Sequence, residues 1–140
     1  MKIHQLSVFV ENRPGHLRAP CQALADAGIN LETLSLADTQ QYGILRLIVR
    51  DWQAAKSVLE AAGFVVNTTE VLAIEVPDRP GGLADVLGMI EQAGINVEYM
   101  YAFAEKRNDK AIVIFRFEDV DAAIAALAHS AVNVIGSVDL

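Results

Sequence analysis

The segments Arg13-Pro14-Gly15-His16-Leu17 and Arg79-Pro80-Gly81-Gly82-Leu83 decide the fold, because they are two copies of one motif placed 66 residues apart. A second pair of segments reads AGINLE at residues 27–32 and AGINVE at residues 93–98, with the same offset. Nine of the 22 positions from residue 11 to residue 32 are identical to their counterparts, whereas chance gives about one or two. The later halves align once two extra residues enter the second copy. The chain is therefore a tandem duplication, with units predicted at residues 1–68 and 69–140.

Each copy contains the same order of predicted elements. An alternating strand comes first, followed by a helix that ends at a glycine, two further strands, a second helix and a short last strand. This order, β-α-β-β-α-β, predicts an α+β fold of the ferredoxin-like type. In that fold both helices lie on one face of an antiparallel sheet.

Three positions in the first half of each copy carry specific expectations. Asn12 and Asp78 precede the Pro-Gly pairs and are candidate helix N-caps, with the proline in the first turn. Leu17 is expected on the apolar face of the first helix. Pro20, which has no counterpart in the second copy, predicts a kink or a late start in that helix.

The composition is that of a globular protein and excludes several classes of function. Of the 140 residues, 53% are hydrophobic and 21% are charged, yet no apolar run approaches the length of a membrane span. The first residues carry no secretory segment, so we expect a cytoplasmic protein. A net charge of −7 opposes binding to a phosphate backbone, and nucleic acid is a poor candidate partner. A single cysteine, Cys21, provides neither an intramolecular disulfide nor a thiolate metal site.

The residue types that catalysis and metal binding require are scattered along the sequence. His4, His16 and His129 are widely separated, and the sequence contains no metal-ligand spacing, phosphate-binding loop or nucleophile motif. The acidic pair Glu118 and Asp119 stands at the start of a predicted helix, where the helix dipole favours negative charge. We therefore predict no enzymatic activity, no metal and no cofactor.

The duplicated turns are the better candidates for a binding site. A helix N-terminus presents unpaired N–H groups that suit a carboxylate, and glycine lets another group approach the backbone. Asn30 and Asn96, which precede the next strand of each copy, supply a donor and an acceptor that suit an α-amino-carboxylate group. An alternative stays open for each residue, since the Asx residues and glycines also serve as caps and turns.

Taken together, NRPGHL with AGIN in the first copy and DRPGGL with AGIN in the second copy resemble the signature of the ACT domain. The resemblance covers essentially the whole chain, twice. It implies a ferredoxin-like unit that pairs with a second ACT unit, often side by side in one eight-stranded sheet. It also implies that small ligands, typically amino acids, bind at the seam between units.

The resemblance assigns two ligand-binding sites, each built from the strand-helix turn of one unit and the start of the second strand of its neighbour. The first site would comprise Asn12, Arg13, Pro14, Gly15, His16 and Leu17 with Asn96 and Val97. The second site would comprise Asp78, Arg79, Pro80, Gly81, Gly82 and Leu83 with Asn30 and Leu31.

The two copies differ at two positions of the turn, so we predict unequal sites. Asn12 faces Asp78 in the alignment, and His16 faces Gly82. A neutral amide suits a ligand carboxylate better than an aspartate does, because Asp78 would repel the carboxylate or accept from the ligand ammonium instead. The first site should therefore be the more polar and the better carboxylate binder.

The leading hypothesis is a non-enzymatic, amino-acid-binding regulatory or sensor protein that acts allosterically, as a homodimer or through a partner enzyme. The alternative is a ligand-independent regulatory subunit or interaction module of an amino-acid metabolic enzyme. A third hypothesis, a small enzyme using His16 and Asp78, lacks a nucleophile, metal or cofactor in the sequence.

Overall fold

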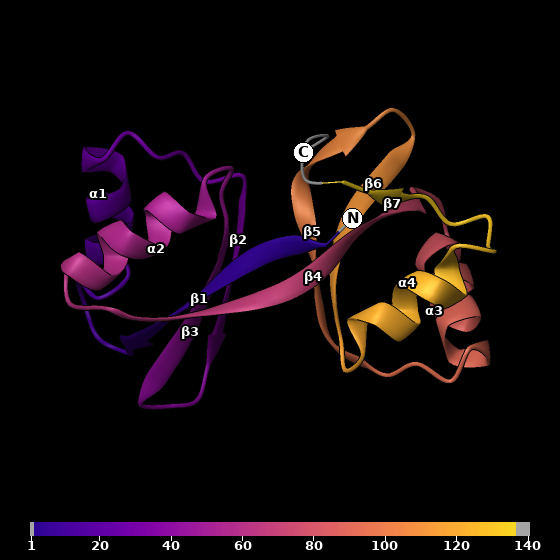
Figure 1. Ribbon diagram of the computed structural model, residues 1–140, viewed down its shortest axis with the longest axis horizontal. Helices are drawn as coiled ribbons and strands as arrows, with labels where there is room; N and C mark the ends of the chain where they lie inside the picture. Colours follow the sequence, from indigo (N-terminus) through magenta and orange to yellow (C-terminus); the bar gives the residue numbers. More distant parts are fainter. Residues whose placement is uncertain (1, 137–140) are drawn as a thin grey trace. The chain divides into compact units, whose positions relative to one another are not determined.

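Figure 1 shows the computed structural model of the chain, in which residues 2–136 are described, without the side chains of residues 104–106. The chain forms two compact units. One unit consists of His4–Thr69, and the described part of the other joins Lys2 and Ile3 to residues 70–136. The first strand and the fourth strand therefore each contribute residues to both units.

The first unit contains two helices and four strands. They are β1 (Ile3–Glu11), α1 (Arg18–Asp26), β2 (Thr33–Asp38), β3 (Tyr42–Ile48), α2 (Trp52–Ala61) and the first part of β4 (Val65–Pro77). The strand order is β2-β3-β1-β4, and β3 pairs antiparallel with both β2 and β1.

The second unit repeats this arrangement. It contains the rest of β4, α3 (Gly82–Gln92), β5 (Val97–Arg107), β6 (Lys110–Phe117), α4 (Val120–Leu127) and β7 (Val134–Ile135). The order is β5-β6-β4, and β7 lies on the other edge of β4, because β6 and β7 both pair with Ala73 and Ile74. Every described strand pair is antiparallel, as the ferredoxin-like prediction requires.

Alternation along the strands places one apolar face of each sheet under its two helices. In the first unit, Leu6, Val8 and Val10 of β1 are buried in a cluster with Leu24 of α1 and Leu59 of α2. In the second unit the same kind of cluster joins β4 and β6 to α3 and α4. Both helices of each unit therefore cover one face of its sheet, and the predicted fold class is confirmed.

The predicted N-caps of the first helices are wrong. The residues that precede α1 and α3 are Leu17 and Gly81, and neither provides a side-chain cap. Gly15 and Gly81 adopt left-handed φ angles of +86° and +85°, which no helix can contain, so each helix begins after its glycine. Asn12 and Asp78 lie upstream of the turn, too far from the helix to cap it.

The late start predicted for α1 is present. The helix begins at Arg18, whereas α3 begins at Gly82, which is the counterpart of residue 16. The Ala19 N–H already donates to the Gly15 carbonyl at 3.1 Å, and Pro20 lacks the N–H that would donate next, to the His16 carbonyl, so the continuous helix begins only at Arg18. Leu17, expected on the apolar face, is 43% exposed because it lies before the helix instead of within it.

The second helix of each unit starts as the sequence predicts. Asp51 caps α2 by accepting a hydrogen bond from the Ala54 N–H, and Asp119 caps α4 in the same way from the Ala122 N–H. Within residues 2–136, no helix has the length and apolar character needed to cross a bilayer.

Candidate functional site

Each Arg-Pro-Gly segment forms a tight turn between a strand and a helix. The carbonyl of Arg13 accepts a hydrogen bond from the His16 N–H at 3.3 Å, and the carbonyl of Arg79 accepts one from the Gly82 N–H at 3.0 Å. Proline in the second position and a left-handed glycine in the third are the requirements of a type II turn. The sequence therefore encodes a turn at this point, not the beginning of the helix.

The turn of the second unit is packed against its own strand. A Cβ atom added to Gly82 would overlap the carbonyl oxygen of Pro77, which is backbone and cannot rotate away. Only glycine fits there. The first unit carries His16 at the equivalent position. The backbone hydrogen bonds of the two turns correspond, since the Ala19 N–H donates to Gly15 as the Asp85 N–H donates to Gly81, so the turns differ in their side chains.

Both turns are fixed to the hairpin that follows the second strand of their unit. The Asn12 N–H donates to the carbonyl of Gln41 at 2.9 Å, and its side-chain amide donates to the carbonyl of Gln40 at 2.8 Å. In the second unit the Asp78 N–H donates to the carbonyl of Asp109 at 3.1 Å. Each turn thus lies at the end of its unit's edge strand, β2 or β5.

The polar side chains of the first turn form a small exposed group. Arg13 Nε lies 3.0 Å from a carboxylate oxygen of Glu11 and 2.6 Å from His16 Nε2. The Glu11 N–H lies 3.3 Å from His16 Nδ1, so donors of the turn face both ring nitrogens of His16. The imidazole of His16 is therefore held within the turn by contacts at both of its nitrogen atoms.

The arginine of the second turn has a different partner. Arg79 Nη2 lies 2.7 Å from a carboxylate oxygen of Asp85 in α3, and its Nη1 donates to the carbonyl of Pro80 at 3.2 Å. Both turn arginines are thus paired with an acidic residue of their own unit, although more than half of each side chain is exposed. Pairing reduces the positive charge that either turn presents.

Asn30 and Asn96 lie at the other end of the edge strands, and both are exposed. Asn30 lines a hollow of about 490 Å³ with Gly28, Ile29, Glu32, Arg50 and Asp51. Asn96 lines two hollows, one of about 410 Å³ on the α3 side and one of about 560 Å³ on the α4 side. The hollow on the α4 side is lined by Gly94, Ile95, Asn96, Glu118, Asp119, Val120 and Ala122.

The hollows of the two units differ in charge. In the first unit, Arg50 forms an ion pair with Glu32 at 3.2 Å. In the second unit the residue aligned with Arg50 is Glu118, so acidic side chains face that hollow without a basic residue among its lining. The unequal character expected for the sites extends to this end of the strands.

Within one unit, the turn and the asparagine do not meet. The turn of the first unit contacts residues 40 and 41, which follow β2, whereas Asn30 precedes β2. Ten residues of extended chain correspond to about 33 Å, far beyond the reach of one amino acid. The composite sites expected from the sequence take each half from a different unit, and they remain predictions.

The sequence interpretation missed the exposed apolar side chains of the edge strands. Leu34 and Leu36 of β2 are 51% and 49% exposed, and Met100 of β5 is 40% exposed. Their register with Leu45, Leu47 and Phe115 places them on the helix-covered face of the sheet, beyond the cover that the helices provide. Alternation in the sequence revealed this face but could not reveal that the strand lies at an edge.

Metal ligands do not gather in the described part of the chain. Among residues 2–136, no group of three or more His, Cys, Asp or Glu side chains is arranged to hold an ion.

Comparison with known proteins identifies the family. The family model described as "ACT domain pair" matches residues 1–140. The crystal structure of protein BT0572 from Bacteroides thetaiotaomicron superposes with a TM-score of 0.92 at 40% sequence identity, covering 99% of this chain and 95% of that one. None of the curated proteins compared with the chain matches it.

More distant structures share the fold. The regulatory subunit of aspartate kinase from Thermus thermophilus, in a ligand-free form, has a TM-score of 0.66 at 19% identity, over 91% of this chain and 92% of that one. The corresponding subunit from Thermus flavus has a TM-score of 0.60 at 18% identity, with the same coverage. At 19% and 18% identity these two structures show only a shared fold. The family model and the Bacteroides thetaiotaomicron protein, at 40% identity, match almost the whole chain. The chain belongs to the ACT domain pair family.

Proposed function

We propose that this protein is a non-enzymatic regulator that binds an amino acid at seams between ACT units and acts in the cytoplasm. The observation that carries the proposal is that the Pro-Gly turn and the asparagine of each unit lie at opposite ends of one edge strand, whose outer edge is not paired among the described residues. The Pro-Gly turn lies at the end of β2, and Asn30 lies before its start. The second unit has the same arrangement about β5.

Pairing of two such edges would complete a site. In an antiparallel pair, the start of one strand lies beside the end of the other. An edge strand that pairs with the edge strand of another ACT unit therefore places the asparagine of one unit beside the turn of the other. On this basis the first site joins Asn12–Leu17 to Asn96 and Val97, and the second joins Asp78–Leu83 to Asn30 and Leu31.

The pairing partner is proposed to be a second copy of the chain. Among residues 2–136, β2 pairs only with β3 and β5 pairs only with β6, so both outer edges are available. An exposed edge strand with apolar side chains is a ready template for another strand. Burying the exposed halves of Leu34, Leu36 and Met100 would contribute about 1 kcal/mol each to association.

The first turn suits the carboxylate of an amino acid better than the second turn does. The side-chain amide of Asn12 uses one N–H for Gln40 and keeps a second N–H for a ligand. The aspartate at residue 78 would repel a carboxylate, so the site containing Asn12 should bind more tightly.

Amino-acid binding can be tested by thermal unfolding in the presence of each common amino acid. A ligand at one hundred times its Kd stabilises a protein by about 2.7 kcal/mol, which raises the Tm of a chain of this size by roughly 6 to 10 °C. Asn12→Ala and Asn96→Ala should each reduce the shift. Asn67→Ala, at an exposed position of β4, is the matched control and should retain it. Absence of any shift at millimolar concentrations would refute ligand binding.

One observation favours a second candidate function, a ligand-independent interaction module for an amino-acid metabolic enzyme. Both turn arginines are already paired, with Glu11 and Asp85, which lowers the attraction of either turn for an anion. The dimer would then form without ligand. Leu36→Asp should disrupt it in sedimentation experiments, whereas Val65→Asp, at an exposed position of β4, should not.

A further inference from the structure

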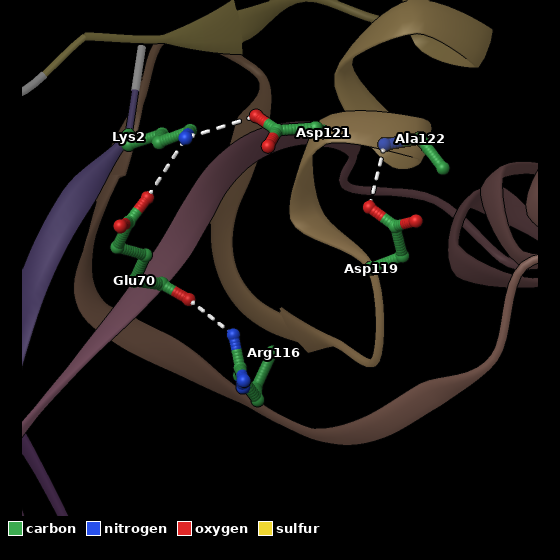
Figure 2. A network of polar contacts seen from close by, with 6 residues as sticks. All are labelled: Lys2, Glu70, Arg116, Asp119, Asp121 and Ala122. Carbon is green, nitrogen blue, oxygen red and sulfur yellow. Dashed lines mark hydrogen bonds and ion pairs between the residues drawn. The ribbon is translucent and has the colours of Figure 1, made fainter.

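Lys2 forms ion pairs with two carboxylates that are distant from it in the sequence. Its Nζ atom lies 3.1 Å from Glu70 at the beginning of the second unit and 2.9 Å from Asp121 in the first turn of α4. Figure 2 shows the ammonium between these two side chains. The residue before β1 therefore belongs structurally to the second unit.

Glu70 is held by a second basic residue. Arg116 of β6 donates from Nη1 to the backbone carbonyl of Glu70 at 3.0 Å, as Figure 2 shows. The Nε atom of Arg116 lies 3.6 Å from a carboxylate oxygen of Glu98 in β5. Glu70 is thus connected through Lys2 to the start of α4 and through Arg116 to the start of β5.

The two connected elements form the walls of the hollow on the α4 side of Asn96, which is called the Asn96 hollow below. One wall is the chain that leads into β5, and the other is the segment from Glu118 to Ala122 at the start of α4. The Ala122 N–H donates to the Asp119 side chain at 3.0 Å, and Asp121, whose carboxylate points toward Lys2, precedes Ala122 in the same turn of helix. The residue that Lys2 binds in α4 therefore lies between two residues that line the hollow, Val120 and Ala122.

We propose that Lys2 is a positioning residue for the Asn96 hollow. It holds the first turn of α4 toward Glu70 and so fixes one wall of the hollow. The first unit has no such ion pair, because the residue aligned with Asp121 is Gln53; there His4, which is aligned with Glu70, stacks on Trp52 at the start of α2 with ring centroids 4.5 Å apart, and the Arg50–Glu32 ion pair lines the hollow. The two hollows would consequently respond differently to the loss of Lys2.

The inference deepens the proposed function, because Asn96, which lines this hollow on the α4 side, belongs to the proposed first ligand site. Its test does not depend on a ligand. The exchange rate of the Ala122 amide hydrogen reports the cap of α4, and the Ala54 amide, which donates to Asp51 at 3.1 Å, is the equivalent reporter in the first unit. Both rates can be measured by NMR on the full chain, together with the side-chain amide shifts of the two asparagines.

Lys2→Met should accelerate exchange at Ala122 about two- to fivefold and shift the side-chain amide signal of Asn96. Exchange at Ala54 and the Asn30 signal should stay unchanged. Lys2→Arg should restore both reporters, because it restores the positive charge. Lys56→Met, which removes a lysine that is 3.9 Å from Glu60 in the first unit, is the control and should leave Ala122 unaffected.

Asp121→Asn supplies an independent variant, since it weakens the same contact from the carboxylate side. It should accelerate Ala122 exchange, and Lys2→Met should have a smaller further effect in that background than in the wild type. Unchanged Ala122 exchange and an unmoved Asn96 signal in Lys2→Met would overturn the proposal. So would equal acceleration at Ala54, because it would indicate general destabilisation.

A ligand titration separates this proposal from the proposed function. With an amino acid that raises the Tm of the wild type, Lys2→Met should weaken the titration monitored at Asn96 and leave that monitored at Asn30 unchanged. If no amino acid binds, the proposed function fails, whereas the exchange rates still decide whether Lys2 positions the hollow.

Discussion

Replacing Gly82 by alanine should destabilise the second unit, although alanine normally favours helix. A Cβ atom at this position would overlap the carbonyl oxygen of Pro77 and approach its Cβ atom to 3.4 Å. Gly82 is the first residue of α3, so relief of the overlap requires the helix start to move away from β4. Overpacking of this kind costs about 1 to 3 kcal/mol.

Gly88→Ala is the matched control, because it makes the same substitution in the same helix. A Cβ atom at Gly88 has no heavy atom within 4 Å, and the first copy carries Gln22 at the equivalent position. Removing a glycine from a helix interior should stabilise the protein by about 0.5 to 1 kcal/mol. The two alanine variants should therefore change stability in opposite directions.

Urea denaturation followed by circular dichroism measures both effects. The midpoint should fall for Gly82→Ala and rise for Gly88→Ala, with unchanged m values if only native-state stability differs. An equal or greater midpoint for Gly82→Ala than for the wild type would refute the claim that the turn packs against Pro77. Since the turn forms half of a proposed site, any amino acid that binds should also bind Gly82→Ala less tightly.

Three other substitutions test separate contacts. Asp119→Ala removes the cap of α4 and should cost about 1 kcal/mol in urea denaturation, and an unchanged midpoint would show that the cap contributes nothing. The ion pairs from Asp121 and Glu70 raise the pKa of Lys2 above its ordinary value of 10.5, so their contribution is present below that pH and is lost as the pH rises through the raised pKa. The stability difference between wild type and Lys2→Met should therefore shrink as the pH rises above 10.5, and a constant difference would contradict this origin. Leu36→Asp should yield monomers in sedimentation velocity, whereas an unaltered assembly would exclude the β2 edge as the interface.

The sequence predicted the architecture well because the duplication repeats every local signal. Alternation in β1 and β4, the glycines after α1 and α3, and the aspartates before α2 and α4 each occur twice. Each of these signals in one copy is therefore supported by an independent signal at the equivalent position of the other copy. This redundancy explains why the order of elements and the face covered by helices agree with the structure.

The start of the first helices was predicted wrongly, since Pro-Gly suits both the first turn of a helix and a type II turn. The choice depends on the sign of one φ angle, at Gly15 or Gly81, which composition does not reveal. From the sequence, the side chain of Asn12 was expected to cap the helix that follows. In the structure it bonds to Gln40, a residue 28 positions away, and no local pattern predicts such a contact.

The candidate site was predicted in its parts. The residues of both turns and both asparagines could be selected from the repeat, and the structure adds that they lie at opposite ends of the edge strands. Exposure of Leu34 and Leu36 depends on the width of the helix layer, and the Lys2 ion pairs depend on a contact across more than a hundred residues. Neither property has a signal within a short window of sequence.

Complementation between two inactive variants tests the central claim most directly. Asn12→Ala and Asn96→Ala should each abolish amino-acid binding at the first site, in a background where Asn30→Ala silences the second. If the site is formed by two chains, an equimolar mixture of the two proteins recovers about a quarter of the wild-type sites, because half of the dimers are mixed and each of these retains one intact site of two. Isothermal titration calorimetry with an amino acid that raises the Tm measures this recovery. A mixture that binds no more ligand than its separate components would contradict a site assembled from two copies of the chain.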